Sequence, residues 1–376
     1  IKSPLTLLLF LWLLYCMLEF FNPEASSFTA WAASVRGVAV YGLVIVVMTF
    51  LLFSRFRDFQ RILLIWSALT LLAVFKAYIQ KNYGFDAAEM RWLFVDGGST
   101  THVIYSGIRY FSFFSDAANF GSGMGFSMVV FSLVGLRVPG WKMRLYFFAV
   151  AFAAAYGMMI SGTRGALAVP FAGYTLYLLL SKNFKILILG AIFVGGAYLF
   201  LNHTMYGQGN TYIRRMRSAF NTNDPSLVVR LENQKKMREY MRGKPFGVGL
   251  GLGGGKAKQY APDAYMSQIP TDSWFVMIWV ETGIVGLVLH LFTLLFILGW
   301  GCFIVLFKIH DPELRGALSA LVAGFFGVMI ASYGNEILGQ FPTGFIIYMT
   351  EAFIFMGLRY DREIAERKQL EEKRHV

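Results

Sequence analysis

Long apolar runs recur along this chain, and they restrict its fold more than any other feature. Runs of about 17 to 25 residues rich in Leu, Ile, Val, Phe and Ala are long enough to cross a bilayer as helices. Hydrophobic residues make up 56% of the 376 positions and charged residues only 15%, which leaves too little polar surface to enclose a soluble core. The sequence therefore predicts a multi-pass membrane protein.

The apolar runs predict an all-α bundle of at least ten transmembrane helices. This count is a minimum because the chain begins at Ile1 rather than at a methionine. The last long run contains Gly283, where we expect the helix to break. The ten runs cover residues 4–21, 33–53, 62–79, 118–136, 143–161, 164–181, 184–202, 274–307, 314–333 and 342–358.

Basic connectors set the expected orientation. If the runs alternate across the membrane, four short connectors and the C-terminal tail share one side, which the positive-inside rule assigns to the cytoplasm. These segments are 54–61, 137–144, 181–185, 308–315 and 359–376. The opposite, outer side then receives residues 22–30, 79–117, 161–165, the large polar loop and 335–343.

The chain divides at its one long polar segment. Residues 1–202 are expected to form about seven helices, 203–273 a large outer loop, 274–358 about three helices and 359–376 a tail. From His203 to Thr271, eleven Lys or Arg stand against four Asp or Glu. A cationic loop in a membrane protein indicates an anionic ligand presented at the membrane surface.

Residues 226–242 of this loop predict an amphipathic, basic helix. Asp224 would cap it, Pro225 suits its first turn and Gly243 would end it. Such a helix either lies on lipid headgroups or covers a site for a phosphorylated lipid. The glycine-rich segment 245–255 is expected to be a flexible loop whose backbone N–H groups can approach an anion. The expected stripe of the helix consists of Leu227, Leu231, Gln234, Arg238 and Met241.

Charged residues at the outer membrane boundary are the candidates for ligand binding. Arg164 lies in a tight hairpin between two runs, and Arg36 and Arg109 should lie near the same boundary. Several guanidinium groups that converge would hold a diphosphate. Asp272 is expected to act as a helix N-cap or as a general base, and Glu281 as an ion-pair partner of a basic side chain.

Other types of chemistry lack a motif. There is no Walker A sequence, no H-E-x-x-H pair and no D-x-D, so no cofactor and no metal is predicted. Cys16 and Cys302 lie far apart in apolar runs, which disfavours a disulfide framework or a cysteine metal site.

Four motifs follow one another in a fixed order. Residues 109–119 form an aromatic outer motif, and the hairpin Ser-Gly-Thr-Arg-Gly-Ala carries Arg164. Arg230 then precedes Lys-Pro-Phe-Gly-Val-Gly-Leu-Gly at 244–251, and Thr-Asp-Ser-Trp leads into Glu-Thr-Gly-Ile-Val-Gly at 281–286. Between Arg109 and Leu291 this order resembles the O-antigen ligase and polysaccharide polymerase family of bacterial inner-membrane glycosyltransferases.

The resemblance implies a GT-C-like, metal-independent, inverting enzyme of the inner membrane whose active site faces the periplasm. Its donor would be a glycan on undecaprenyl diphosphate, and its acceptor a hydroxyl of lipid A-core or of a growing glycan; membrane lipids, but no nucleic acid, would be further partners. Arg164 and Arg230 would be catalytic with Asp272, which stands where the family's ligases have a histidine. The predicted substrate-binding residues are Arg36, Arg109, Arg214, Arg215, Arg238 and Glu281.

Alternatives remain at this stage. The departure at Asp272 leaves ligase and polymerase open. A transporter or flippase of a lipid-linked glycan would need ionisable residues midway through the runs, of which His290 and Glu351 are the main examples. A purely structural membrane subunit would leave the basic loop and the outer arginines unexplained.

Overall fold

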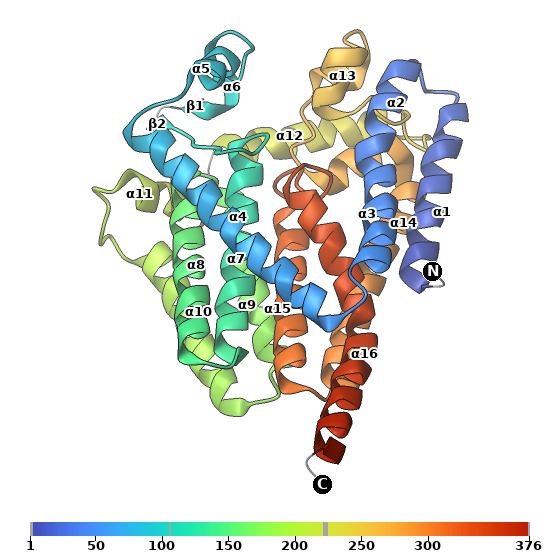
Figure 1. Ribbon diagram of the computed structural model, residues 1–376. Coiled ribbons are helices and arrows are strands. Elements are labelled where there is room, and N and C mark those ends of the chain that lie inside the picture. Colours follow the sequence, from blue (N-terminus) through green and yellow to red (C-terminus); the bar gives the residue numbers. More distant parts are fainter. Residues whose placement is uncertain (1–2, 105–106, 221–224, 375–376) are drawn as a thin grey trace.

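The computed structural model describes residues 3–104, 107–220 and 225–374, and these form a bundle of helices with one short hairpin (Figure 1). The hairpin pairs β1 (Val103–Ile104) with β2 (Gly107–Ile108). The helices are α1 (Pro4–Leu18), α2 (Phe28–Val35), α3 (Tyr41–Leu52), α4 (Phe56–Asn82), α5 (Ala87–Phe94), α6 (Ser99–His102), α7 (Ala117–Arg137), α8 (Trp141–Ile160), α9 (Ala168–Leu180), α10 (Phe184–His203), α11 (Thr211–Arg217), α12 (Pro225–Tyr240), α13 (Gly254–Tyr260), α14 (Trp274–Phe307), α15 (Pro312–Ala331) and α16 (Thr343–Arg374).

The predicted all-α membrane architecture is confirmed, but the predicted count of ten spans is not. Within the described residues, seven helices are long and apolar enough to cross a membrane. Two further apolar helices, Arg164–Leu180 and Leu187–His203, are shorter. In α16 the last predicted run continues without a break into the charged tail. Seven of the ten predicted runs coincide with these long helices, and the runs 164–181, 184–202 and 342–358 do not.

Small residues let the central helices approach closely. The spans of α7 and α15 are each 83% buried, which makes them the centre of the bundle beside α8 and α9. A Cβ at Gly327 would overlap the Val169 carbonyl, and one at Gly173 would lie 3.0 Å from the Ala323 carbonyl oxygen. Close packing of this kind is how helices associate where lipid supplies no hydrophobic driving force.

The predicted break in the last long run is confirmed at Gly283. This residue has φ 67° and ψ −170° inside α14, a conformation open almost only to glycine. The break frees three carbonyl groups, and each has a donor. Val248 N–H donates to Val280 O at 2.9 Å, Gly249 N–H to Glu281 O at 3.0 Å, and the Tyr15 hydroxyl to Thr282 O at 2.7 Å.

The glycine-rich segment is therefore not the flexible anion loop that the sequence predicted. Residues 247–253 are buried against α14 and α2, and the N–H groups of Val248 and Gly249 are used by α14. Glycine is needed here for close packing, since a Cβ at Gly251 would overlap the Ala30 carbonyl. The segment fixes the large loop onto the bundle.

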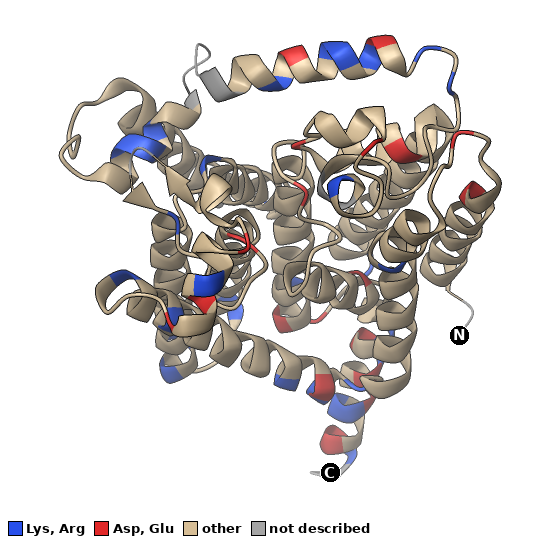
Figure 2. Ribbon diagram, turned by 90° about the horizontal axis from the view of Figure 1, so that it is seen from above, with Lys and Arg blue, Asp and Glu red and all other residues tan. Residues whose placement is uncertain are grey.

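The outer segments of the sequence gather at one end of the bundle, which we call the loop face (Figure 1). Here Asn22 donates to Phe246 O, and Ser27 to Tyr260 O. The helix α12 lies across one edge of this face, with basic positions along it (Figure 2). Its predicted cap Asp224 lies outside the described residues. Its buried side carries Met237 and Met241, whereas Leu231 and Arg238 of the predicted stripe are exposed.

Candidate functional site

Four arginines from distant parts of the chain line one cavity of ≈ 450 Å³ at the loop face: Arg109, Arg164, Arg215 and Arg230. None of the described residues that line it is acidic. Leu167, Phe171 and Leu227 give it an apolar side next to the membrane helices. A cavity with this composition offers a place for an anionic group that carries an apolar chain.

Arg164 is positioned by the tight turn that ends α8. Gly162 in this turn has φ 59°, and its carbonyl accepts a hydrogen bond from Arg215 Nε. Arg164 begins a single 3₁₀ turn, Arg164–Leu167, and donates to Ser218 Oγ at 3.3 Å. The turn and the end of α11 thus hold two guanidinium groups beside each other.

Arg109 enters the cavity directly after strand β2 of the β1–β2 hairpin. It donates to Thr101 O at 3.1 Å and to Thr163 Oγ1 at 2.7 Å, which links the hairpin to the Arg164 turn. Burial lowers the pKa of Arg109, Asp116 opposes this effect, and the positive charge of Arg164 adds to it. The lowered pKa is thus due chiefly to burial of the guanidinium, with a smaller contribution from Arg164, and a bound anion would offset both effects.

Arg230 and Asn335 complete the lining of the cavity, and the Asn335 side chain lies against Gly165 of the Arg164 turn. Arg230 donates to Gly334 O at 3.1 Å from the N-terminal half of α12, and Asn335 comes from the turn between α15 and α16. In the part of the chain that the structure describes, Arg230 Nε, Arg109 Nε and Asn335 Nδ2 are buried donors without an acceptor. Buried donors are nearly always bonded, so three of them around one cavity indicate an acceptor-rich ligand.

Three of the predicted arginines lie elsewhere. Arg36 is exposed in the π-helical segment that joins α2 to α3, and Arg214 and Arg238 are exposed on α11 and α12. None of them lines the cavity. Helix periodicity explains the difference, because Arg214 and Arg215 are neighbours that point about 100° apart on α11, and only Arg215 faces the Arg164 turn.

Glu281 does not line the cavity either. Its side chain is buried at the α14 break, where its Oε2 accepts from Ser34 Oγ at 3.3 Å. Glu281 lies two residues before the break, where its carbonyl accepts the hydrogen bond from Gly249 N–H.

Asp272 is not the N-cap of α14. Ser273 fills that role, since its hydroxyl accepts from Val276 N–H. Asp272 is exposed and has φ 50°. Its neighbours are fixed to the turn after α15: Thr271 Oγ1 donates to Glu336, and Trp274 N–H donates to Asn335 O at 3.3 Å. The backbone at Asp272 is therefore held beside the turn that carries Asn335, although Asp272 does not line the cavity itself.

Sequence reasoning missed Asn335 and Thr163. Asn335 was predicted only as part of an outer connector, and nothing in its local sequence separates it from other turn residues. Thr163 was visible in the Arg164 hairpin, but its bond to Arg109 joins positions 54 residues apart. Among the described residues, no group of three or more His, Cys, Asp or Glu side chains could hold a metal ion.

Fold and cavity together define a multi-pass membrane protein with a cationic cavity at one end of its bundle. Residues 149–291 match the family described as O-Antigen ligase. The chain is also 28% identical over 190 residues to an O-antigen polymerase of Salmonella muenchen, a match that covers 47% of this chain and 43% of that relative. No solved structure matches the chain. Both matches agree with the resemblance to the O-antigen ligase and polymerase family that the motifs indicated.

Proposed function

We propose that this protein is a glycosyltransferase that moves a glycan from undecaprenyl diphosphate to an acceptor hydroxyl. The chain spans less than half of the curated relative that it matches, so the proposal rests chiefly on the site. The observation that carries it is the cavity with four arginines and three buried donors that have no acceptor among the described residues. A diphosphate supplies both the negative charge and the acceptor oxygens that such a cavity requires.

In this proposal, the arginines stabilise the leaving group. The acceptor oxygen attacks the anomeric carbon while the bond from that carbon to the phosphate oxygen breaks, so the diphosphate departs with the electron pair and configuration inverts. Arg164, Arg215 and Arg230 face the negative charge that develops on it, and this electrostatic stabilisation needs no metal. The polyprenyl chain would leave the cavity past Leu167 and Phe171, toward the membrane helices.

Asp272 is the proposed general base. It would take the proton of the acceptor hydroxyl as the new bond forms, which restores the charge balance of the reaction. Its exposed carboxylate is suited to meet an acceptor that arrives from water, and its backbone is fixed beside the wall that carries Asn335.

We propose further that the loop face is periplasmic and that ten segments cross the inner membrane. The three beyond the seven long helices are α9, α10 and the apolar first half of α16. Basic residues at the other end of the bundle support this orientation, since Arg55, Arg359, Arg362 and Arg367 gather around one hollow there.

The experiment that tests the proposal is transfer in proteoliposomes. The purified protein receives glycan on undecaprenyl diphosphate alone, and then with lipid A-core, and products are resolved by mass. A longer glycan on the carrier identifies a polymerase, as the Salmonella muenchen relative suggests; glycan on lipid A-core alone identifies a ligase, as the family description suggests.

Variants link the reaction to the cavity. Arg164→Ala, Arg230→Ala and Asp272→Ala should abolish transfer by folded protein. Arg242→Ala, which removes an exposed arginine of the same loop, is the matched control and should retain it. Full transfer in the three site variants would refute the proposal.

A further inference from the structure

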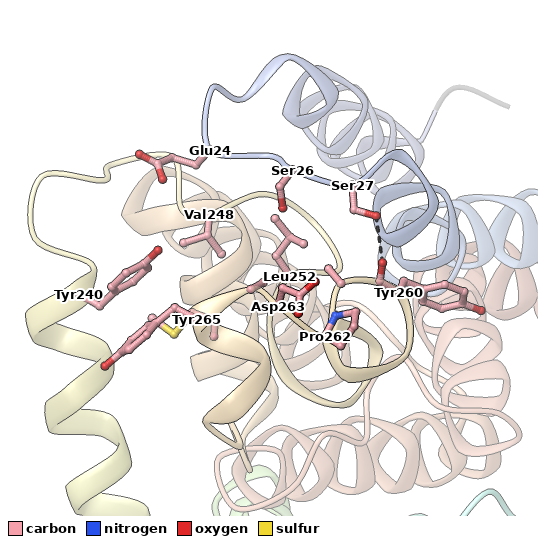
Figure 3. A pocket seen from close by; sticks show the side chains of 13 residues that line it. Glu24, Ser26, Ser27, Tyr240, Val248, Leu252, Tyr260, Pro262, Asp263 and Tyr265 are labelled. Atoms are coloured by element: carbon pink, nitrogen blue, oxygen red, sulfur yellow. Dashed lines mark hydrogen bonds between the residues drawn. The ribbon is translucent and has the colours of Figure 1, made fainter.

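A second cavity, of ≈ 550 Å³, lies at the loop face beside the C-terminal end of α12 (Figure 3). Four segments build it: the N-terminal connector around Glu24, the C-terminal end of α12 at Tyr240, the glycine-rich segment at residues 248–252, and residues 260–266. Val248, Leu252 and Met266 form its apolar floor, and all three are buried. We call it the tyrosine pocket.

The tyrosine pocket differs chemically from the arginine cavity. None of the described residues that line it is a lysine or arginine, whereas Glu24 and Asp263 supply carboxylates and Ser26 and Ser27 supply hydroxyls. Lys244 does not line the pocket, but its Nζ pairs with Glu24 at 2.5 Å and lies 4.9 Å from the centroid of the Tyr240 ring. The carboxylates and hydroxyls accept hydrogen bonds from a ligand's hydroxyls, and with Lys244 paired to Glu24 the lining suits a neutral ligand better than a phosphate.

Aromatic rings complete the pocket. Tyr240 and Tyr265 stack with their centroids 4.5 Å apart, and Figure 3 shows the pair at one side, opposite Ser27 and Pro262. Tyr265 is 49% exposed, so about half of its side chain remains accessible to a ligand. A sugar ring has the matching form, with C–H groups on its faces and hydroxyls around its rim.

The two cavities are joined by one rigid element. Arg230 and Tyr240 lie ten residues apart on α12, which corresponds to about 15 Å along the helix axis. The glycine-rich segment that supplies Val248 and Leu252 is bonded to α14 at its break. A glycan whose diphosphate occupies the arginine cavity could therefore place a later sugar in the tyrosine pocket.

We propose that the tyrosine pocket binds a neutral sugar of the glycan, several sugar units away from the diphosphate. This inference rests on the proposed function, but it assigns a separate site. The pocket would hold the glycan by its sugars while the arginines hold its diphosphate.

The test measures sugar binding without the lipid. Purified protein in nanodiscs is titrated with the oligosaccharide that mild acid releases from the producing cell's own lipid-linked glycan, and saturation-transfer NMR detects contact with the sugar protons. Ser26→Trp should fill the pocket from an exposed position, and Tyr265→Ala should remove the outer ring. Both should weaken binding about tenfold or more.

Matched variants separate the pocket from general damage. Tyr265→Phe keeps the ring and should bind nearly as wild type, and Thr100→Trp adds the same bulk at an exposed position on α6. Unchanged binding in both Ser26→Trp and Tyr265→Ala, or no binding by the wild type, would overturn the inference.

Failure of the inference and failure of the proposed function are distinguishable. Binding of undecaprenyl diphosphate without sugar should be weakened by Arg230→Ala and unaffected by Ser26→Trp. If this lipid binding behaves as stated but sugar binding ignores the pocket, only the sugar site is wrong. If the lipid does not bind, the proposed function fails.

Discussion

Gly283→Ala should detach the glycine-rich segment from α14 and thereby loosen the large loop. The added methyl would overlap the Pro245 carbonyl oxygen and come within 2.5 Å of the Gly247 nitrogen, so the backbone must move. The conformation at φ 67°, ψ −170° would cost about 1–3 kcal/mol for alanine. Two backbone hydrogen bonds, from Val248 and Gly249, would add about 1 kcal/mol each.

The sum, about 3–5 kcal/mol, is local and can be measured by hydrogen exchange. In the wild type, the amides of Val248 and Gly249 should be strongly protected, and in Gly283→Ala they should exchange at least about a hundredfold faster. Gly299→Ala is the matched control in the same helix, because a Cβ there meets nothing within 4 Å. Equal exchange in the two variants would refute the account of the break.

Three further predictions concern the arginine cavity and the outer hairpin. Arg230→Lys keeps the charge but loses the planar fork, so the affinity for undecaprenyl diphosphate, measured by titration in nanodiscs, should fall about tenfold or more; unchanged affinity would mean that charge alone matters. Asn335→Asp should weaken that affinity more than Asn335→Ala, since it adds a carboxylate among the arginines; the reverse order would show that Asn335 does not face the anion. Burial, with Arg109 nearby, lowers the pKa of His102, whose Nε2 accepts a hydrogen bond from Ala117 N–H at 3.0 Å. Protonation of His102 breaks this bond, so the protection of the 107–117 amides against hydrogen exchange should be complete above about pH 6.5 and fall below it. His102→Gln should remove this pH dependence.

Sequence periodicity and hydropathy predicted the membrane class and the break at Gly283. Both depend on local properties, namely the length of an apolar run and the conformational freedom of one residue. The hairpin at Arg164 was also recognisable, because it lies between two apolar runs.

The composition of the cavity was only partly predictable. The sequence named Arg109, Arg164, Arg215 and Arg230, but it could not separate them from Arg36, Arg214 and Arg238, because that choice depends on which helix face meets another element. Asn335 joins the cavity through the turn after α15, where its side chain lies against Gly165. The two residues are 170 positions apart in the chain, and local sequence does not encode a contact over that separation.

The glycine-rich segment shows the limit most clearly. Its glycines fit close packing as well as they fit the flexible anion-binding loop that the sequence led us to expect. The segment packs because its N–H groups bond carbonyl groups of α14. Those carbonyl groups are available only because α14 breaks at Gly283.

The central claim is that the arginine cavity holds a lipid diphosphate, and its most direct test is equilibrium binding of undecaprenyl diphosphate to the protein in nanodiscs. The account predicts that the wild type and Arg242→Ala bind it more tightly than undecaprenyl monophosphate, and that Arg164→Ala and Arg230→Ala lose at least about tenfold in affinity. Equal affinity in all four proteins, or no preference for the diphosphate, would contradict it.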